Sequence, residues 1–315
     1  MVDNKTKDNR FLEEGIIKTI RYFRRFSYRP FLGELHIFLP GETSKDRLLK
    51  EINRLSEKKI LYFDKHSKRV GFSEKYTVGE YGIVKSQTKN YKLQNLARRQ
   101  AESKNKLKKI RFYIKSLSMF PQIKLIGLSG SMAMMNAGYD DDIDLFIITA
   151  KNRLFSGRFI ALLLGQVLGI RRKRQSTARK SLRVGFKDKV CLNLFFDEND
   201  LTVPEHKKNL YIAHEILQMK PLINKNQTYE RFLEANKWIY DLFPNAKITN
   251  KLQIANRSRS LLGIWNFVGD VVEWLLKQAQ LILINHHRTT EIITNTQLWF
   301  FPDDFEGKLN ALQAV

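Results

Sequence analysis

Two aspartates, Asp142 and Asp144, stand at the start of the apolar run Ile143–Ile148, which is typical of a buried strand. Because side chains alternate along a strand, both carboxylates are expected on one face, roughly 6–7 Å apart. Two carboxylates at the end of an apolar strand repel each other and are costly to desolvate. A hard divalent cation removes that cost, so the pattern predicts a site for Mg²⁺ or Mn²⁺.

A turn of small residues precedes the two aspartates. The apolar run Ile123–Leu128 predicts another buried strand, which ends at Ser129-Gly130-Ser131, before a short helical stretch, Met132–Asn136. The backbone N–H groups of Gly130 and Ser131, together with the Ser131 hydroxyl, suit a phosphate group. The sequence therefore predicts a phosphate site close to a metal site.

This combination resembles the nucleotidyltransferase superfamily that includes DNA polymerase beta. The family signature is an apolar strand, Gly-Ser, a spacer, and then Asp-x-Asp in a second apolar strand. Here the match is Gly130, Ser131, Asp142 and Asp144. The resemblance implies a nucleotidyltransferase core over residues 91–200, built as a small mixed sheet with helices. It also implies a nucleoside triphosphate (NTP) as substrate.

The resemblance further implies a third carboxylate in the strand expected at Val190–Phe196, where this chain has Asn193. Asn193 can touch a metal with its carbonyl oxygen but cannot take a proton. Two functions stay open. The first is metal-dependent transfer of a nucleoside monophosphate to an acceptor such as RNA, a transfer-RNA end, DNA or a small hydroxylated molecule. Either Asp140 or Asp141, or else positioning and metal charge, would then assist. The second is a catalytically degenerate protein that acts as a nucleic-acid-binding regulator.

The net charge of +23, with 55 basic and 32 acidic residues, favours a polyanionic partner such as RNA or DNA. A Lys-rich composition without a binding role is the alternative. The densest run spans residues 171–189, where nine basic residues are opposed only by Asp188. It could contact triphosphate or a nucleic-acid backbone, or be a basic loop without a ligand. Its candidate contact residues are Arg171, Arg172, Lys173, Arg174, Arg179 and Lys180.

Residues 1–75 are expected to form a separate domain of three helices and a hairpin. Apolar spacing predicts a first helix around Ile16–Phe23, a second at Phe31–Phe38 and a third after the possible caps Thr43 or Ser44. Strands at Lys59–Phe63 and Arg69–Phe72 follow. This order resembles a winged helix-turn-helix domain, used either for DNA contact or for protein packing. The resemblance implies a DNA-facing third helix presenting Lys45, Arg47, Lys50 and Arg54.

Beyond a connector at residues 76–90, the stretch Tyr91–Ser118 predicts a long basic helix. Its charged side is either an ordinary solvated face or a positive ridge beside the aspartates. The apolar stretch Phe155–Leu168 predicts a helix that covers the sheet.

Residues 201–315 are expected to be a helical C-terminal region, which completes an α+β fold. Helices are predicted at Lys207–Met219, Thr228–Leu242 and Arg259–Ile284, with more helix over 289–315, broken at Pro302. The pair His214-Glu215 lacks the second histidine of a zinc protease, since position 218 is Gln. The apolar stripe of Arg259–Ile284 is typical of core or of a partner surface.

The single cysteine, Cys191, excludes an internal disulfide and suggests a reducing, cytoplasmic setting. The first ten residues are polar and do not form a signal peptide. The longest apolar stretches are too short or too charged to cross a membrane, so no membrane partner is expected. The sequence leaves the oligomeric state open.

Overall fold

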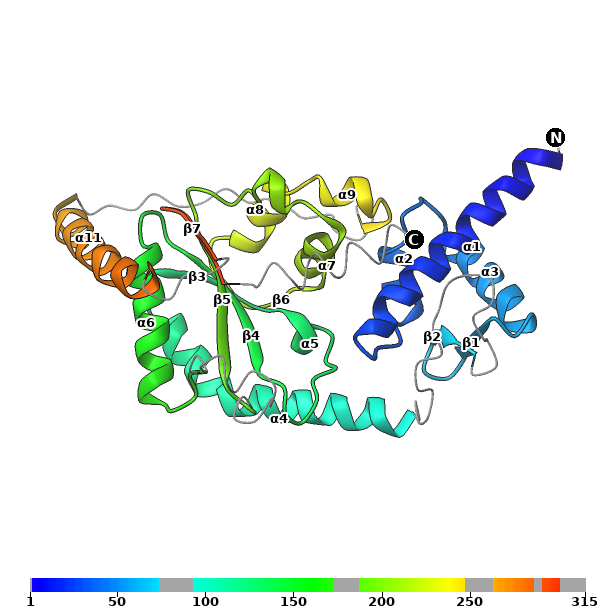
Figure 1. Cartoon of the computed structure of the whole chain (residues 1–315), viewed down its shortest axis with the longest axis horizontal. Helices are drawn as coiled ribbons and strands as arrows, with labels where there is room; N and C mark the ends of the chain where they lie inside the picture. The colour runs from blue at the N-terminus through cyan, green and yellow to red at the C-terminus, as the bar shows by residue number, and fades with distance from the viewer. Residues whose placement is uncertain (1, 74–92, 173–186, 247–262, 286–290, 301–315) are drawn as a thin grey trace. The chain divides into compact units, whose positions relative to one another are not determined.

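The computed structural model of the chain describes residues 2–73, 93–172, 187–246, 263–285 and 291–300 (Figure 1). Within these ranges the chain forms two compact units. The first is drawn from residues 1–96 and 237–252, and the second from 97–236 and 253–314. None of the helices described is both long and apolar enough to traverse a bilayer.

The first unit contains the predicted three helices and hairpin. They are α1 (Val2–Arg25), α2 (Leu32–Ile37), α3 (Lys45–Glu57), β1 (Leu61–Asp64) and β2 (Arg69–Phe72). The apolar side chains at helical spacing, such as Ile16, Ile20 and Ile52, are fully buried in one core. The Ser44 hydroxyl caps α3 by accepting the backbone N–H of Arg47 at 3.2 Å. The likeness to a winged helix stays a prediction.

A segment from much later in the chain completes the first unit. It includes α9 (Ile239–Leu242), and the Phe243 ring packs edge-on against Phe38 at 5.2 Å. The Asn245 side chain donates to the Gly41 carbonyl at 2.8 Å and accepts from the Thr43 N–H at 3.0 Å. The predicted C-terminal region, 201–315, therefore does not coincide with one compact unit.

The second unit is built on a six-stranded mixed sheet, which confirms the predicted α+β class with a mixed sheet. Its strands are β3 (Ile123–Leu128), β4 (Ile143–Thr149), β5 (Val190–Asp197), β6 (Lys220–Asn224), β7 (Ile292–Ile293) and β8 (Gln297–Trp299). Their order is β6-β3-β4-β5-β8-β7, with β4 and β5 parallel and every other neighbouring pair antiparallel.

Helices pack on both faces of this sheet (Figure 1). On one face, α4 (Leu93–Ser118) and α6 (Leu154–Val167) pack on side chains such as Leu145 and Ile147. On the other face, Phe146, Phe196 and Phe232 of α8 (Thr228–Ala235) form an aromatic cluster with ring centroids 5.1–5.7 Å apart. The second face also carries α7 (Leu210–Gln218), which follows the short 3₁₀ turn Glu205–Lys207. Because strand side chains alternate, the even-numbered residues of β4 point to the α7 and α8 side.

The expectation that residues 201–315 are helical is wrong at three places, where the chain adds β6, β7 and β8 to the sheet. β6 is an edge strand, and Pro221, which pairs there with Gly127, is the kind of residue that edge strands tolerate. β7 and β8 have two and three residues, too few to show a period. The predicted break at Pro302 lies outside the described residues.

Candidate functional site

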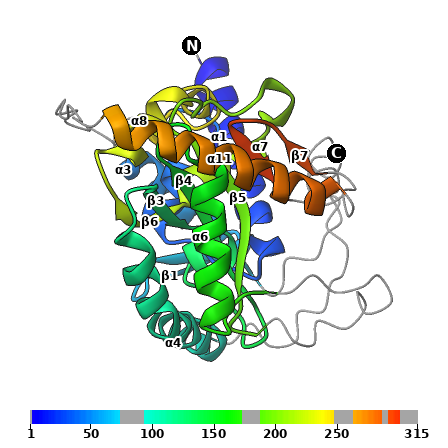
Figure 2. The ribbon, with the colours of Figure 1, turned by 90° about the vertical axis from the view of Figure 1, so that its left-hand side faces the viewer.

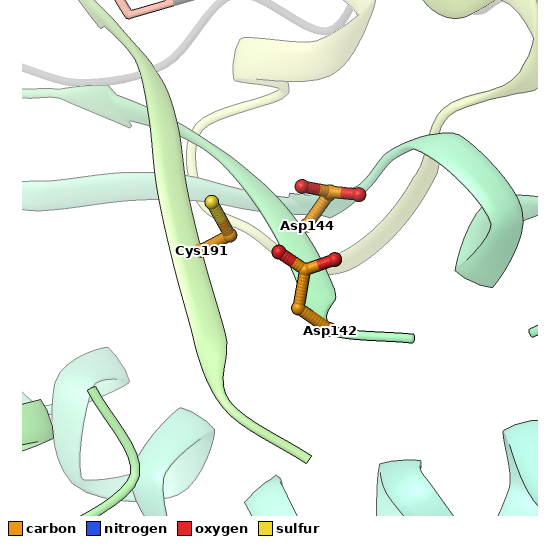
Figure 3. Close-up of side chains that lie close together, drawn as sticks. All are labelled: Asp142, Asp144 and Cys191. Carbon is orange, nitrogen blue, oxygen red and sulfur yellow. The ribbon is translucent and has the colours of Figure 1, made fainter. Parts of the chain in front are cut away.

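The two predicted aspartates come together at the start of β4. Asp142 directly precedes the strand and Asp144 is its second residue. Ligand atoms of Asp142, Asp144 and Cys191 all lie within 4.8 Å of one another (Figure 3). Cys191 belongs to β5, where the parallel register places it opposite Asp144. The carboxylates therefore share one face, as the alternation of strand side chains requires.

The small-residue turn touches this cluster. Gly130 has a φ of +57° and begins the four-residue helix α5 (Gly130–Ala133). A Cβ atom at Gly130 would lie 2.9 Å from Oδ2 of Asp144, so both the backbone conformation and the space favour glycine. The Ser129 N–H also donates to the Asp144 carbonyl oxygen at 3.1 Å. The turn 129–131 and Asp144 thus form one local structure.

Asn193, the predicted third position, lies at a β-bulge. Leu145 pairs with Leu192 and Phe146 pairs with Leu194, so Asn193 is the extra residue between them. Its Nδ2 donates to Oδ1 of Asp144 at 3.0 Å. Its Oδ1 accepts from the Cys191 thiol at 2.9 Å. Asn193 therefore contacts the site through its amide N–H, and the thiol of Cys191 stands beside it.

Arg172 is brought to the same cluster from the predicted basic run. Its Nη1 donates to Oδ2 of Asp142 and to Sγ of Cys191, the latter at 3.2 Å. Burial alone lowers the pKa of Arg172, but Cys191 and Asp142 raise it by more, so the guanidinium stays charged. The site contains a cation of its own, bonded to one of its carboxylates.

Burial and like charge act against ionisation in the cluster. The pKa of Asp144 is raised well above its ordinary value, first by burial and then by the charges of Asp142 and Glu215. Burial, followed by the charge of Asp144, also raises the pKa of Cys191, which keeps this group a thiol. Excess negative potential that a nearby cation would relieve is the main electrostatic property of the site.

Glu215 of α7 is a site residue that sequence reasoning missed. Its Oε2 accepts the N–H of Gly130 at 3.1 Å. Burial raises the pKa of Glu215 to about 7, although the Gly130 N–H opposes this. The sequence alone marks the pair 214–215 only as an incomplete zinc motif. The available signal was an acidic residue between the apolar positions Ile212 and Ile216 of one helix, both of which are buried.

A buried lysine holds the loop that leads to Asp142. Lys106 of α4 is fully buried. Its Nζ donates to the carbonyl oxygens of Tyr139 and Asp141 at 2.9 and 2.7 Å. It also donates to Oδ1 of Asp188 at 2.9 Å. Three acceptors compensate the buried charge, and the bonds fix the loop immediately before the first aspartate.

The donor set fits a divalent cation in part. The carboxylates of Asp142 and Asp144 are the hard oxygen ligands that Mg²⁺ or Mn²⁺ prefers. Burial and then the charge of Asp142 raise the pKa of Asp144, and such an ion would offset both. A protonated thiol at Cys191 is a poor third ligand for a hard cation. Arg172 would share Asp142 with the ion or release it.

The other predicted nucleic-acid contacts have different surroundings. Lys50 is exposed on α3, and Arg171 is exposed at the end of the segment after α6. Arg54 is held by Glu13 at 2.5 Å and by Glu51 at 2.6 Å. The remaining four, Lys173, Arg174, Arg179 and Lys180, lie outside the described residues. On α4, four exposed basic side chains share one side of the helix: Lys104, Lys108, Arg111 and Lys115.

Comparisons of the chain with models of protein families, with curated proteins and with solved structures found no match. The resemblance to nucleotidyltransferases therefore stays a prediction that rests on the residues and geometry described above.

Proposed function

We propose that this protein transfers a nucleoside monophosphate from an NTP to a polynucleotide acceptor in a reaction that needs Mg²⁺ or Mn²⁺. The observation that carries the proposal is the contact between Gly130 and Asp144. It joins a turn that contains the Ser131 hydroxyl and backbone amides to a pair of carboxylates under mutual repulsion. A metal-bound polyphosphate needs both features side by side.

Each residue has a role that follows from its chemistry. Asp142 and Asp144 would hold the metal, which supplies positive charge to the phosphate oxygens when bound. Gly130 and Ser131 would contact the polyphosphate with backbone N–H groups and a hydroxyl. Asn193 orients Asp144 through its amide and cannot serve as a base. Positioning of the acceptor would therefore contribute more than proton abstraction.

Glu215 and Arg172 suit the same site. Because Glu215 accepts the Gly130 N–H, an incoming phosphate oxygen would have to take over that donor. Arg172 can pair with phosphate as readily as with Asp142, since a guanidinium forms strong hydrogen bonds to either anion.

A second candidate function is a nucleotide-binding regulator without turnover. It is favoured by one observation, the pairing of Arg172 with Asp142 beside a thiol and an amide where a third carboxylate is expected. A guanidinium that stays on Asp142 would take the place of a metal ion and leave the site inactive.

Incubation with each α-labelled NTP, Mg²⁺ or Mn²⁺ and bulk RNA separates the two functions. Transfer of label to RNA that is lost in Asp142→Asn supports the transferase. The matched control is Asp46→Asn, which removes an exposed carboxylate from α3. No transfer with any nucleotide or metal, together with retained nucleotide binding, would overturn the transferase and support the regulator.

A further inference from the structure

One side of α11 (Gly263–Asn285) carries polar and charged side chains that bond to neighbouring elements. Glu273 accepts the backbone N–H groups of Phe155 and Ser156 at 2.6 and 2.9 Å, where α6 begins. Gln280 is buried and donates to the Phe155 carbonyl oxygen at 2.8 Å. Two more side chains of this stripe bond to neighbours, Asp270 to Arg153 and Lys277 to Asn295. The spacing of three or four residues puts all four on one side of the helix.

The opposite side of α11 is apolar and exposed. We call it the outer arc: Val271, Val272, Trp274, Leu275, Gln278, Ala279, Ile282 and Leu283. Its six large apolar side chains are 44–72% exposed. The charged residues of positions 269–284 all belong to the inner stripe, so the outer arc has no charge. Figure 2 shows α11 lying across α6 on the surface of its unit. An ordinary surface helix turns polar and charged side chains to the solvent, whereas the exposed side of α11 is almost entirely apolar.

We propose that the outer arc packs against the same arc of a second copy of this chain. Val271, Leu275, Gln278 and Ile282 follow each other at intervals of four, three and four residues, the spacing of a seam between two helices. Gln278 lies near the middle of this row. In a twofold pair it meets its own mate, with which it can exchange hydrogen bonds.

The size of the arc fits this partner. The exposed fractions leave on the order of 600 Å² of apolar surface on α11, against roughly 800 Å² per partner in a standard interface. α6 adds further exposed apolar side chains, Phe159, Leu163 and Val167. A patch of this size on one face usually marks an association site.

Charge favours a second copy over a lipid surface. The chain carries +23, so two copies repel each other overall, and an uncharged meeting surface such as the outer arc adds the least to that repulsion. A helix that lies on a membrane presents basic residues to the headgroups. At positions 269–284 of α11 the single basic residue is Lys277, which is bonded to Asn295 on the inner side. Gln278 would also be left unpaired in hydrocarbon.

Light scattering coupled to size exclusion tests the proposal on the full chain at high salt. We expect twice the chain mass of 37.1 kDa at micromolar concentration. The double variant Leu275→Glu, Ile282→Glu places charges in the seam and should raise the dissociation constant by at least about a hundredfold. The matched control is Phe112→Glu, a substitution at a 66% exposed apolar residue of α4, which should leave the dimer intact.

A cross-link gives a second measurement. Gln278→Cys should form a disulfide-linked dimer on mild oxidation, whereas the wild type, whose single Cys191 is buried, should not. Monomers at every concentration, equal effects of Phe112→Glu and the seam variant, or a seam variant that still dimerises would each overturn the proposal. A monomer whose binding to anionic vesicles depends on the outer arc would also overturn it.

Discussion

At the scale of single residues, the candidate site contains more carboxyl groups than cationic groups. Asp142, Asp144 and Glu215 contribute carboxyl groups, and Arg172 contributes one guanidinium. A site left in this state gains by binding a cation, by taking up protons or by keeping Arg172 in place. These three responses can be separated by substitution.

Replacement of Arg172 tests the first response. Arg172→Gln removes a positive charge that touches Asp142, so we expect Mn²⁺ in the absence of nucleotide to bind on the order of tenfold more tightly, or ~1.4 kcal/mol. Electron paramagnetic resonance of free Mn²⁺ measures this. The control is Arg171→Gln, which changes the adjacent exposed arginine. Unchanged or weaker Mn²⁺ binding in Arg172→Gln would contradict competition between the guanidinium and the metal.

Proton uptake predicts a pH-dependent stability. Burial raises the pKa of Glu215 from 4.5 to about 7, so the folded protein holds this proton where the unfolded chain releases it. The free energy of unfolding therefore falls as pH rises from about 4.5 to about 7. Glu215→Gln stays neutral and should avoid this loss, which is on the order of 3 kcal/mol. Urea denaturation at pH 4.5 and pH 8 measures the difference. The control Glu57→Gln, at an exposed position, should keep the wild-type dependence of the unfolding free energy on pH. The same pH dependence in the wild type, Glu215→Gln and Glu57→Gln would refute the prediction.

At the scale of elements, α4 positions the aspartates from the opposite side of the sheet. Lys106→Met leaves two carbonyl oxygens and part of Asp188 without a donor, so we expect a loss of about 3 kcal/mol in the free energy of unfolding. Lys109 also bonds to Asp188, but its side chain is half exposed. Lys109→Met should therefore lower the free energy of unfolding by less than about 1 kcal/mol. Chemical denaturation measures the unfolding free energies of both variants. Equal losses would contradict the prediction that buried Lys106 stabilises the loop before Asp142 more than Lys109 does.

Long periodic elements could be predicted from the sequence almost to the residue. The helix expected at Phe155–Leu168 is α6, Leu154–Val167, and the strand expected at Val190–Phe196 is β5, Val190–Asp197. The helix expected at Thr228–Leu242 is instead divided. At its break, buried Asn236 bonds to the Leu201 and Phe232 carbonyl oxygens at 2.8 Å, so a distant segment determines where α8 ends.

The candidate site was predictable only where its members are neighbours in the chain. Gly130, Asp142 and Asp144 form a local pattern, so their meeting could be expected. The placement of Cys191 and Asn193 depends on the register of β4 and β5 and on the β-bulge at Asn193. Hydrophobic periodicity reveals neither the register nor the bulge. Glu215 belongs to α7, far along the chain from Gly130, and only the fold brings the two residues together.

At the scale of the whole molecule, the net charge of +23 predicts affinity for polynucleotides but does not say which surface binds them. Two exposed basic sets are available on described helices and their ends. One is the α4 ridge, Lys104, Lys108, Arg111 and Lys115, and the other is the α3 set, Lys45, Lys50, Lys58 and Lys59. The α4 ridge belongs to the second unit, which contains the candidate site, and the α3 set belongs to the first unit.

The salt dependence of polynucleotide binding shows whether the α4 ridge or the α3 set contacts a given nucleic acid. Every lost phosphate contact lowers the slope of log affinity against log salt by about 1, so four alanines on the α4 ridge should lower it by up to about 4 for single-stranded RNA. Four alanines in the α3 set remove the same charge and should leave that slope unchanged, while weakening duplex DNA binding as a winged helix would. Fluorescence anisotropy over a salt series measures both. Equal slopes for both variants on both ligands would mean that net charge alone, and neither surface, governs binding.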